Sequence, residues 1–225
     1  MSLADAPLTR ERIVSAAEDV LRRFGPAKAT VVDVARALGV SHAAVYRHVA
    51  TKAELRDLVV GRWAETTMPP LRAIAAKPGP APERLRQLFD ALIAVKRHRA
   101  TEDPELFAAY RTLAADAQSV VAAHLDELVR LAATVIRSGV EEGTFRTVDP
   151  VASGRAVLFA TSRFHHPVHS PEWADPAIDA AYDDVWRMLM DGLCIPKGPD
   201  QRRKHRRRRT PSQDGVQGPA VRQSP

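Results

Sequence analysis

Apolar residues recur at intervals of three and four along most of the chain, which is the spacing of amphipathic helices rather than of strands. The first such segment covers residues 9–24. Its apolar stripe consists of Ile13, Ala16, Ala17, Val20, Leu21 and Phe24. Thr9 supplies a hydroxyl cap at the start, and Gly25-Pro26 ends the pattern. The pattern predicts an all-α fold that begins with this helix.

Hydroxyl residues mark the starts of the next three helical segments. The segments follow Thr30, Ser41 and Thr51 and cover residues 31–38, 42–48 and 52 onward. Thr51 and Glu54 also have the spacing of a capping box, in which hydroxyl and carboxylate bond each other's free backbone N–H groups. The first helix and the segments over 31–38 and 42–48 predict an N-terminal three-helix helix-turn-helix domain, which we expect to extend over residues 9–66 and to include the start of the helix after Thr51.

Proline-rich breaks separate this domain from a second helical region. Pro69-Pro70 and residues 77–82 interrupt the periodicity, which resumes at Glu83. Three later Asp-Pro pairs suit helix starts, with Asp as the cap and Pro in the first turn; they lie at residues 103–104, 149–150 and 175–176. Further helices are expected over residues 117–142, 150–164 and 176–193, with a loop over 165–171. We therefore expect a larger C-terminal helical domain over residues 67–195.

The positive charge of the chain is concentrated in its last thirty residues. Residues 196–225 carry nine Lys or Arg against two Asp, a net charge of +7 in a chain whose total is +6. The remaining residues are therefore close to neutral, and the case for nucleic-acid binding must come from a motif. The segment has almost no large apolar residues, so we expect a disordered basic tail, either solvated or adding nonspecific phosphate contacts.

Cysteine content and hydropathy bear on the compartment. The single cysteine, Cys194, cannot form an intramolecular disulfide and lies in no metal or redox motif. The first eight residues lack a basic start and a long apolar run, and no later stretch reaches the apolar length that a bilayer requires. We expect a soluble, cytoplasmic protein with no cofactor and no membrane partner.

Residues 30–49 have the features of a helix-turn-helix. Gly39 permits the positive φ of a tight turn, Val40 fills the junction between the helices, and Ser41 starts the second helix. Helical spacing turns Val45 and Val49 inward. The outward face that remains carries His42, Ala43, Tyr46 and Arg47. This is the face that a DNA major groove would meet.

The side chains of this segment suit DNA binding. Ala43 and Ala44 permit close approach and contact with a thymine methyl, while His42 and Arg47 can donate to base edges or phosphates. The hydroxyl of Tyr46 suits a phosphate, and Lys52 begins a helix whose free N–H groups can hold another phosphate. The predicted DNA contacts are Thr30, Ser41, His42, Ala43, Ala44, Tyr46, Arg47, His48 and Lys52.

Residues 30–55 resemble the TetR family of bacterial transcriptional regulators. The resemblance is carried in order and spacing by Ala-Leu-Gly-Val-Ser at 37–41, Val-Tyr-Arg-His-Val at 45–49 and Thr-Lys-Ala-Glu-Leu at 51–55. It covers about the first sixty residues, whereas the remainder matches in helical architecture alone. Two residues depart from the family pattern: Ala43 stands where the family often has Gly, and Val49 where it often has Phe.

The resemblance implies a homodimer that binds a pseudo-palindromic operator in double-stranded DNA and leaves it when a small-molecule effector enters the C-terminal domain. We expect a repressor with a largely apolar effector. In such a fold the candidate cavity residues are Trp63, Phe89, Phe107, Tyr110 and His124, although all of them could equally be ordinary core. The dimer is expected through the last two helices, whose apolar residues include Val157, Leu158, Ile178, Val185 and Leu189.

Three histidines within five residues suggest a competing function. His165, His166 and His169 could bind a metal or form the centre of an enzyme built on a helical bundle. No carboxylate or thiol joins them at a suitable spacing, and the chain has no nucleophile elbow, phosphate loop or Glu-x-x-His pair. The alternative is that His165 and His166 end a helix, where the dipole favours them, before Pro167. We therefore expect neither catalysis nor a metal site; the effector, operator, regulated genes and sign of regulation stay open.

Overall fold

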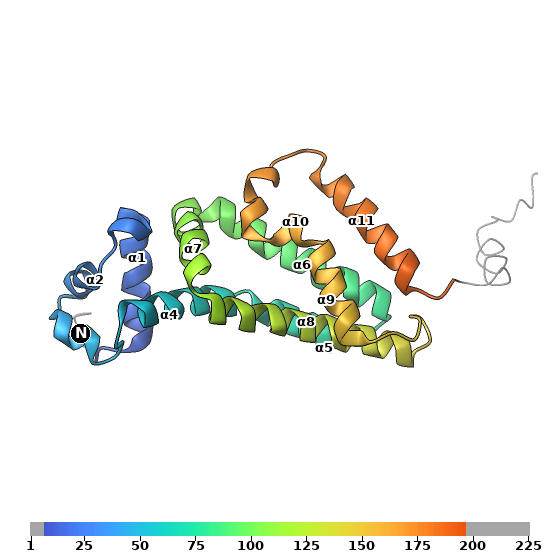
Figure 1. Cartoon of the computed structure of the whole chain (residues 1–225), viewed down its shortest axis with the longest axis horizontal. Helices are drawn as coiled ribbons and strands as arrows, with labels where there is room; N and C mark the ends of the chain where they lie inside the picture. Colours follow the sequence, from blue (N-terminus) through green and yellow to red (C-terminus); the bar gives the residue numbers. More distant parts are fainter. Residues whose placement is uncertain (1–6, 197–225) are drawn as a thin grey trace, which may run out of the picture. The chain divides into compact units, whose positions relative to one another are not determined.

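The computed structural model describes residues 7–196, and this part of the chain is almost entirely helical (Figure 1). Its helices are α1 (Arg10–Lys28), α2 (Val31–Leu38), α3 (His42–Tyr46), α4 (Lys52–Glu65), α5 (Met68–Ala76), α6 (Ala81–Glu102), α7 (Pro104–Asp116), α8 (Gln118–Glu141), α9 (Pro150–Ala160), α10 (Ser162–His165), the 3₁₀-helix η1 (Pro167–Glu172) and α11 (Ile178–Leu193). The predicted all-α fold is confirmed. The predicted basic tail, apart from Pro196, lies outside the described residues, as do residues 1–6.

Helix α1 begins as predicted but continues past the predicted end. The Oγ1 of Thr9 accepts a hydrogen bond from the backbone N–H of Arg12 at 3.2 Å. Gly25 adopts φ 70° and kinks the helix, and helical turns then continue to Lys28. Phe24, the residue before this kink, is exposed, so its expected place in the apolar stripe is wrong. The other five stripe residues are buried.

The next three helices start at the predicted hydroxyl caps, with one difference in the capping boxes. Thr30 and Asp33 form a complete box: the N–H of Asp33 donates to the Thr30 hydroxyl, and that of Thr30 donates to the Asp33 carboxylate, both at 3.2 Å. The predicted Thr51–Glu54 box is half formed. The N–H of Glu54 donates to the Thr51 hydroxyl at 3.0 Å, but the Glu54 carboxylate accepts from Ala50 at 2.7 Å.

Two proline-containing segments of the C-terminal region differ from expectation. Pro69-Pro70 lies in the first turn of α5 and does not interrupt helix formation, because the first turn needs no intrahelical N–H donors. The predicted helix over 150–164 is two helices, α9 and α10, separated at Thr161. The predicted loop over 165–171 is also wrong, since His165 ends α10 and the 3₁₀-helix η1 follows.

Asp-Pro pairs mark helix starts at two of the three predicted places. Asp103 caps α7 by accepting from the N–H of Leu106 at 3.1 Å, and Asp149 caps α9 by accepting from that of Val151 at 2.8 Å. Asp175 instead accepts from Ala177 in a turn, and α11 begins at Ile178.

Buried apolar side chains form three clusters. The first cluster contains residues of α1, α2, α3 and α4 together with Ala109 of α7. The second contains residues of α4 and α7 around Trp63, and the third fills the C-terminal bundle. Helices α8 and α9 lie side by side in that bundle (Figure 1), where a Cβ on Gly154 would approach the Val129 carbonyl oxygen at 3.1 Å. The domain boundary at 66/67 stays a prediction. No helix between residues 7 and 196 has the length and apolarity to cross a membrane.

Candidate nucleic-acid interface and ligand cavity

The two faces of α3 differ as the sequence predicts. Val45 and the following Val49 are fully buried in the N-terminal cluster. The exposed side chains are those of His42, Ala43, Tyr46 and Arg47. Ala44 is only 8% exposed, because its place on the helix turns it toward the core. Its expected contact with a thymine methyl is therefore inconsistent with its position.

The turn before α3 is built as the motif predicts. Gly39 adopts φ 68°, and the N–H of Val40 donates to the Ala35 carbonyl oxygen at 3.0 Å. The Ser41 hydroxyl then caps α3 by accepting from Ala44 at 3.2 Å. The Thr30 hydroxyl is likewise engaged in its capping box. Both hydroxyls thus have structural roles, and their DNA contacts stay predictions.

An ion pair that sequence reasoning missed fixes the segment after α3. The guanidinium of Arg10 donates to the His48 carbonyl oxygen at 2.9 Å and to the Glu54 carboxylate at 2.8 Å. The same carboxylate accepts from Ala50, so α1, α4 and residues 48–50 are joined through one Glu side chain. The capping pattern could have pointed to Glu54, whereas nothing local to Arg10 indicates its partner. These two residues position α3.

The exposed surface of α3 carries positive charge without negative charge, and Glu54, the acidic residue in the first turn of α4, is paired with Arg10. Residues 42–49 include no acidic side chain, and Arg47 is exposed. Lys52 is exposed in the first turn of α4, where the helix dipole and free N–H groups also attract anions. This arrangement suits contact with a phosphate backbone and with acceptors on base edges.

A cavity of about 590 Å³ lies in the C-terminal region. Its walls come from α6, α7, α8, α10 and η1. They consist of Lys96, Ala108, Tyr110, Arg111, Thr112, Ala114, Ala115, Val121, His124, Leu125, Leu128, His165, His166, Pro167 and Val168. The size is that of a small-molecule site.

Two of the five predicted cavity residues line this space. Tyr110 and His124 do, whereas Trp63 and Phe107 line a separate cavity of about 370 Å³ bounded by α1, α4, α6 and α7. Phe89 is part of the C-terminal core, beside a space of about 10 Å³ that is too small for a ligand. These three residues do not line the 590 Å³ cavity, because aromatic spacing is the same in a core and in a cavity wall, and their role in ligand binding stays a prediction.

Lys96 is the side chain that sequence reasoning missed in this cavity. It is 3% exposed, and its Nζ lies 3.5 Å from Nε2 of His124 and 4.1 Å from the ring centre of Trp63. Burial, assisted by the positive charge of Arg99, lowers the Lys96 pKa to about 7. Among the described residues, no Asp or Glu lines the cavity. Lys96 is thus buried without a carboxylate partner among the residues that line the cavity.

His165, which is buried, and His124, which is half-buried, are neutral near pH 7. Burial, and secondarily the charge of Lys96, lowers the pKa of both His124 and His165 to about 3. Nε2 of His165 lies 3.2 Å from the Leu158 carbonyl oxygen, which can only accept, so this nitrogen carries the proton. Within the described residues, no group of three or more His, Cys, Asp or Glu side chains is arranged to hold a metal ion.

Lys96→Met is expected to stabilise the protein. A buried ammonium without a carboxylate is costly, and methionine keeps the length and the contact with Trp63, so we expect a gain of about 1–3 kcal/mol in the free energy of unfolding at pH 7. The unfolded pKa is 10.5 and the folded pKa is about 7. Between these values the unfolded chain binds more protons, so the wild type loses stability as pH falls through this window.

Urea unfolding near pH 7 and near pH 10 would measure this effect. The gain from Lys96→Met should be larger near pH 7 and shrink as the pH rises toward 10.5, where the amine of the unfolded chain also begins to lose its proton. The matched control is Lys77→Met, which removes an exposed lysine at the end of α5 and should change little. A destabilised Lys96→Met variant would show that the ammonium is compensated.

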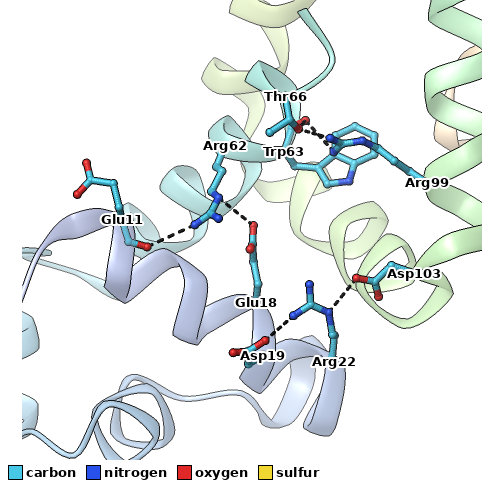
Figure 2. A network of polar contacts seen from close by, with 9 residues as sticks. All are labelled: Glu11, Glu18, Asp19, Arg22, Arg62, Trp63, Thr66, Arg99 and Asp103. Atoms are coloured by element: carbon cyan, nitrogen blue, oxygen red, sulfur yellow. Dashed lines mark hydrogen bonds and ion pairs between the residues drawn. The ribbon is translucent and has the colours of Figure 1, made fainter. Parts of the chain in front are cut away.

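Ion pairs join the helix-turn-helix region to the C-terminal region (Figure 2). Arg22 of α1 binds Asp19 on its own helix at 2.5 Å and Asp103, the cap of α7, at 2.8 Å. Arg62 of α4 lies 3.6 Å from the carboxylate of Glu18. The ion pair between Arg22 and Asp103 connects α1 directly to α7, a helix that lines the cavity.

A second link in Figure 2 joins α4 to α6. Arg99 donates to the Trp63 carbonyl oxygen at 3.3 Å and to the Thr66 hydroxyl. The Trp63 ring stacks on Tyr110 with 3.6 Å between ring centres, and Nζ of Lys96 lies 4.1 Å from the centre of the same Trp63 ring. Trp63 therefore contacts two cavity residues while belonging to the helix that follows α3.

A helix-turn-helix with an exposed cationic second helix, joined to a helical bundle with a cavity, defines a DNA-binding regulator. Two family profiles agree: "Bacterial regulatory proteins, tetR family" matches residues 13–59, and "Tetracyclin repressor-like, C-terminal domain" matches residues 81–186. The chain belongs to the TetR family of bacterial transcriptional regulators.

Solved structures of TetR regulators share this fold. SmeT, the repressor of the Stenotrophomonas maltophilia multidrug efflux pump SmeDEF, superposes with a TM-score of 0.64 at 20% identity, covering 86% of this chain and 93% of SmeT. A TetR regulator from Haloarcula marismortui gives 0.66 at 21% identity, covering 83% and 98%. SmeT in complex with triclosan gives 0.62 at 19% identity, covering 83% and 91%. Comparison with curated protein sequences finds no match.

Proposed function

We propose that the protein is a repressor that binds a pseudo-palindromic operator as a homodimer and leaves it when a small molecule enters the 590 Å³ cavity. The observation that carries this proposal is the position of α7. Tyr110 of α7 lines the cavity, while Ala109, the residue before it, packs into the core of the helix-turn-helix region. A ligand that displaces α7 would therefore also change the packing of the helix-turn-helix region.

The proposed DNA contacts divide into base and phosphate contacts. Arg47 and His42 lie where a helix in the major groove would present donors to base edges, and Ala43 permits close approach. Tyr46 and Lys52 flank that face and would bind phosphates. Thr30, Ser41 and His48 are secondary candidates, since two are engaged as caps and His48 is half-buried.

The proposed dimer surface uses α9 and α11, but not the residues that the sequence suggested. Val157, Leu158 and Ile178 are buried in the chain's own core, and Val185 and Leu189 are half-buried. The large apolar side chains exposed on these helices are instead Val151, Phe159 and Met188. Exposed apolar groups on two helices of one bundle suit a two-fold interface, which buries the same surface on both copies.

Ligand-dependent release is supported by the links across the molecule. Arg22–Asp103 ties α1 to the start of α7, and Arg99 ties α6 to the carbonyl oxygen of Trp63 in α4. Both α6 and α7 line the cavity, so a ligand that shifts them would change the position of α3 relative to the second copy. SmeT, a repressor with the same fold, has been solved with triclosan.

Selection from a random double-stranded DNA library, followed by footprinting, tests the proposal. We expect a pseudo-palindrome whose half-sites lie about one helical turn, or about 34 Å, apart, or a multiple of that distance. In vitro transcription from a promoter overlapping that sequence should fall when the protein is added. Stimulated transcription would contradict repression, and recovery of no preferred sequence would contradict operator binding.

A further inference from the structure

We propose that the effector is an amphipathic carboxylic acid, whose carboxylate pairs with Lys96 while its apolar body fills the remainder of the cavity. The inference rests on the proposed function, because it takes this cavity as the effector site. It replaces the expectation of a simply apolar effector with a more specific chemical class.

The charges around Lys96 carry the argument. The groups around it are His124 on α8, His165 on α10, His166 directly after α10, Trp63 on α4 and, acting through its charge, Arg99 on its own helix. Burial lowers the pKa of all three histidines, and none of these groups is acidic. A buried cation of this kind has lost its hydration without gaining an anionic partner, so a ligand carboxylate would supply the missing interaction.

The remaining cavity walls favour an apolar body for the ligand. Val121, Leu125 and Leu128 of α8 form an aliphatic wall, and Ala108 and Ala114 of α7 leave room opposite it. This wall favours an apolar chain or ring system. A ligand cation would meet Lys96 and Arg111 without a compensating carboxylate, and a neutral ligand would leave the buried ammonium as costly as before.

Binding of a carboxylate would change the protonation of Lys96. Because its pKa is about 7 in the free protein, the amine is mostly neutral at a pH one unit above that value. A carboxylate beside Nζ favours the charged form, so binding there should take up about one proton per site. Proton uptake is a signature that a merely apolar fit does not produce.

Pairing of a ligand carboxylate with Lys96 would also affect the helix-turn-helix region. Nζ of Lys96 lies over the ring of Trp63, and the backbone of Trp63 is held by Arg99. A carboxylate in the cavity would compete for the ammonium with the Trp63 ring and with His124. The side chain that binds the ligand is therefore in contact with the helix that follows α3.

Isothermal titration calorimetry of the full-length protein tests the inference with two matched pairs of probes. Decanoate is compared with decan-1-ol, and naphthalene-2-carboxylate with naphthalene-2-carboxamide, at about one pH unit above the Lys96 pKa, in two buffers of different ionisation enthalpy. At least one acid should bind about 10- to 100-fold more tightly than its neutral partner, with proton uptake. Equal or tighter binding of the neutral partners, or no binding of either acid, would overturn the inference.

Two variants separate the role of Lys96 from general effects. Lys96→Met should abolish the preference for the acids and the proton uptake while leaving the affinity for decan-1-ol nearly unchanged. Lys77→Met removes an exposed lysine by the same substitution and should retain both. If Lys96→Met retains the preference, the carboxylate lies elsewhere and the inference fails.

A DNA-shift assay with the selected operator distinguishes failure of this inference from failure of the proposed function. If decan-1-ol or the carboxamide releases the DNA and the acids do not, ligand-controlled repression stands and the carboxylate assignment falls. If the acids bind with proton uptake but leave the protein on DNA, the ligand class stands and the proposed release falls.

Discussion

Replacing His42 and Arg47 together with alanine is expected to weaken operator binding by about 100-fold or more, at about 1–3 kcal/mol for each lost base contact. Both side chains are exposed on α3, so neither replacement opens a void in the core. The temperature of unfolding should therefore hardly change. Fluorescence anisotropy with labelled operator, beside calorimetric unfolding, would measure both quantities.

Single-site variants assign the faces of α3. Tyr46→Phe and Lys52→Ala should weaken specific and nonspecific DNA binding together, because phosphates carry no sequence information. Val45→Ala should instead lower the stability by about 1–2 kcal/mol by opening a void. The faces are assigned wrongly if Arg47→Ala destabilises the fold while Val45→Ala leaves it unchanged.

The helix-turn-helix could be predicted because its determinants are local. Ser41 caps α3, Gly39 adopts the positive φ that the turn requires, and Val45 and Val49 lie one helical turn apart on the buried face. Each feature depends on neighbours within a few residues. The predicted DNA contact of Ala44 conflicts with this spacing, which leaves Ala44 off the outward face and buried.

The cavity could not be predicted with the same accuracy, because it depends on contacts between distant helices. Phe89 and Tyr110 have the same aromatic character and helical setting, yet one lies in the core and the other lines the cavity. Lys96 did carry a signal: it follows Leu92 and Ile93 at helical spacing and so continues their buried stripe. A lysine in such a stripe is a candidate for a ligand-binding charge.

The dimer residues show a related limit. Leu158 and Phe159 are adjacent in α9, yet Leu158 is fully buried in its own chain and Phe159 is 54% exposed. Periodicity predicts that α9 has apolar surface on more than one side. It cannot tell which side meets the chain's own core and which side is left for a partner, because both are equally apolar.

Phe159→Glu combined with Met188→Glu is expected to convert a dimer into a monomer and to weaken binding to the full operator by about 100- to 10,000-fold, through loss of bivalent attachment. The two side chains are 54% and 76% exposed on α9 and α11. A two-fold interface brings the same surface of both copies together, so the new carboxylates of the two copies add repulsion to the lost apolar contact. Light scattering at micromolar concentration would give the oligomeric state.

The control must add a charge at an exposed apolar residue away from α9 and α11. Phe24→Glu at the end of α1 meets this requirement, since Phe24 is exposed on the first helix, and the variant should remain dimeric. The double variant should keep its helical circular dichroism and its weak binding to an isolated half-site, because α3 and its supporting contacts are untouched. If the double variant stays dimeric, the two copies associate through another surface and the assignment of α9 and α11 is incorrect.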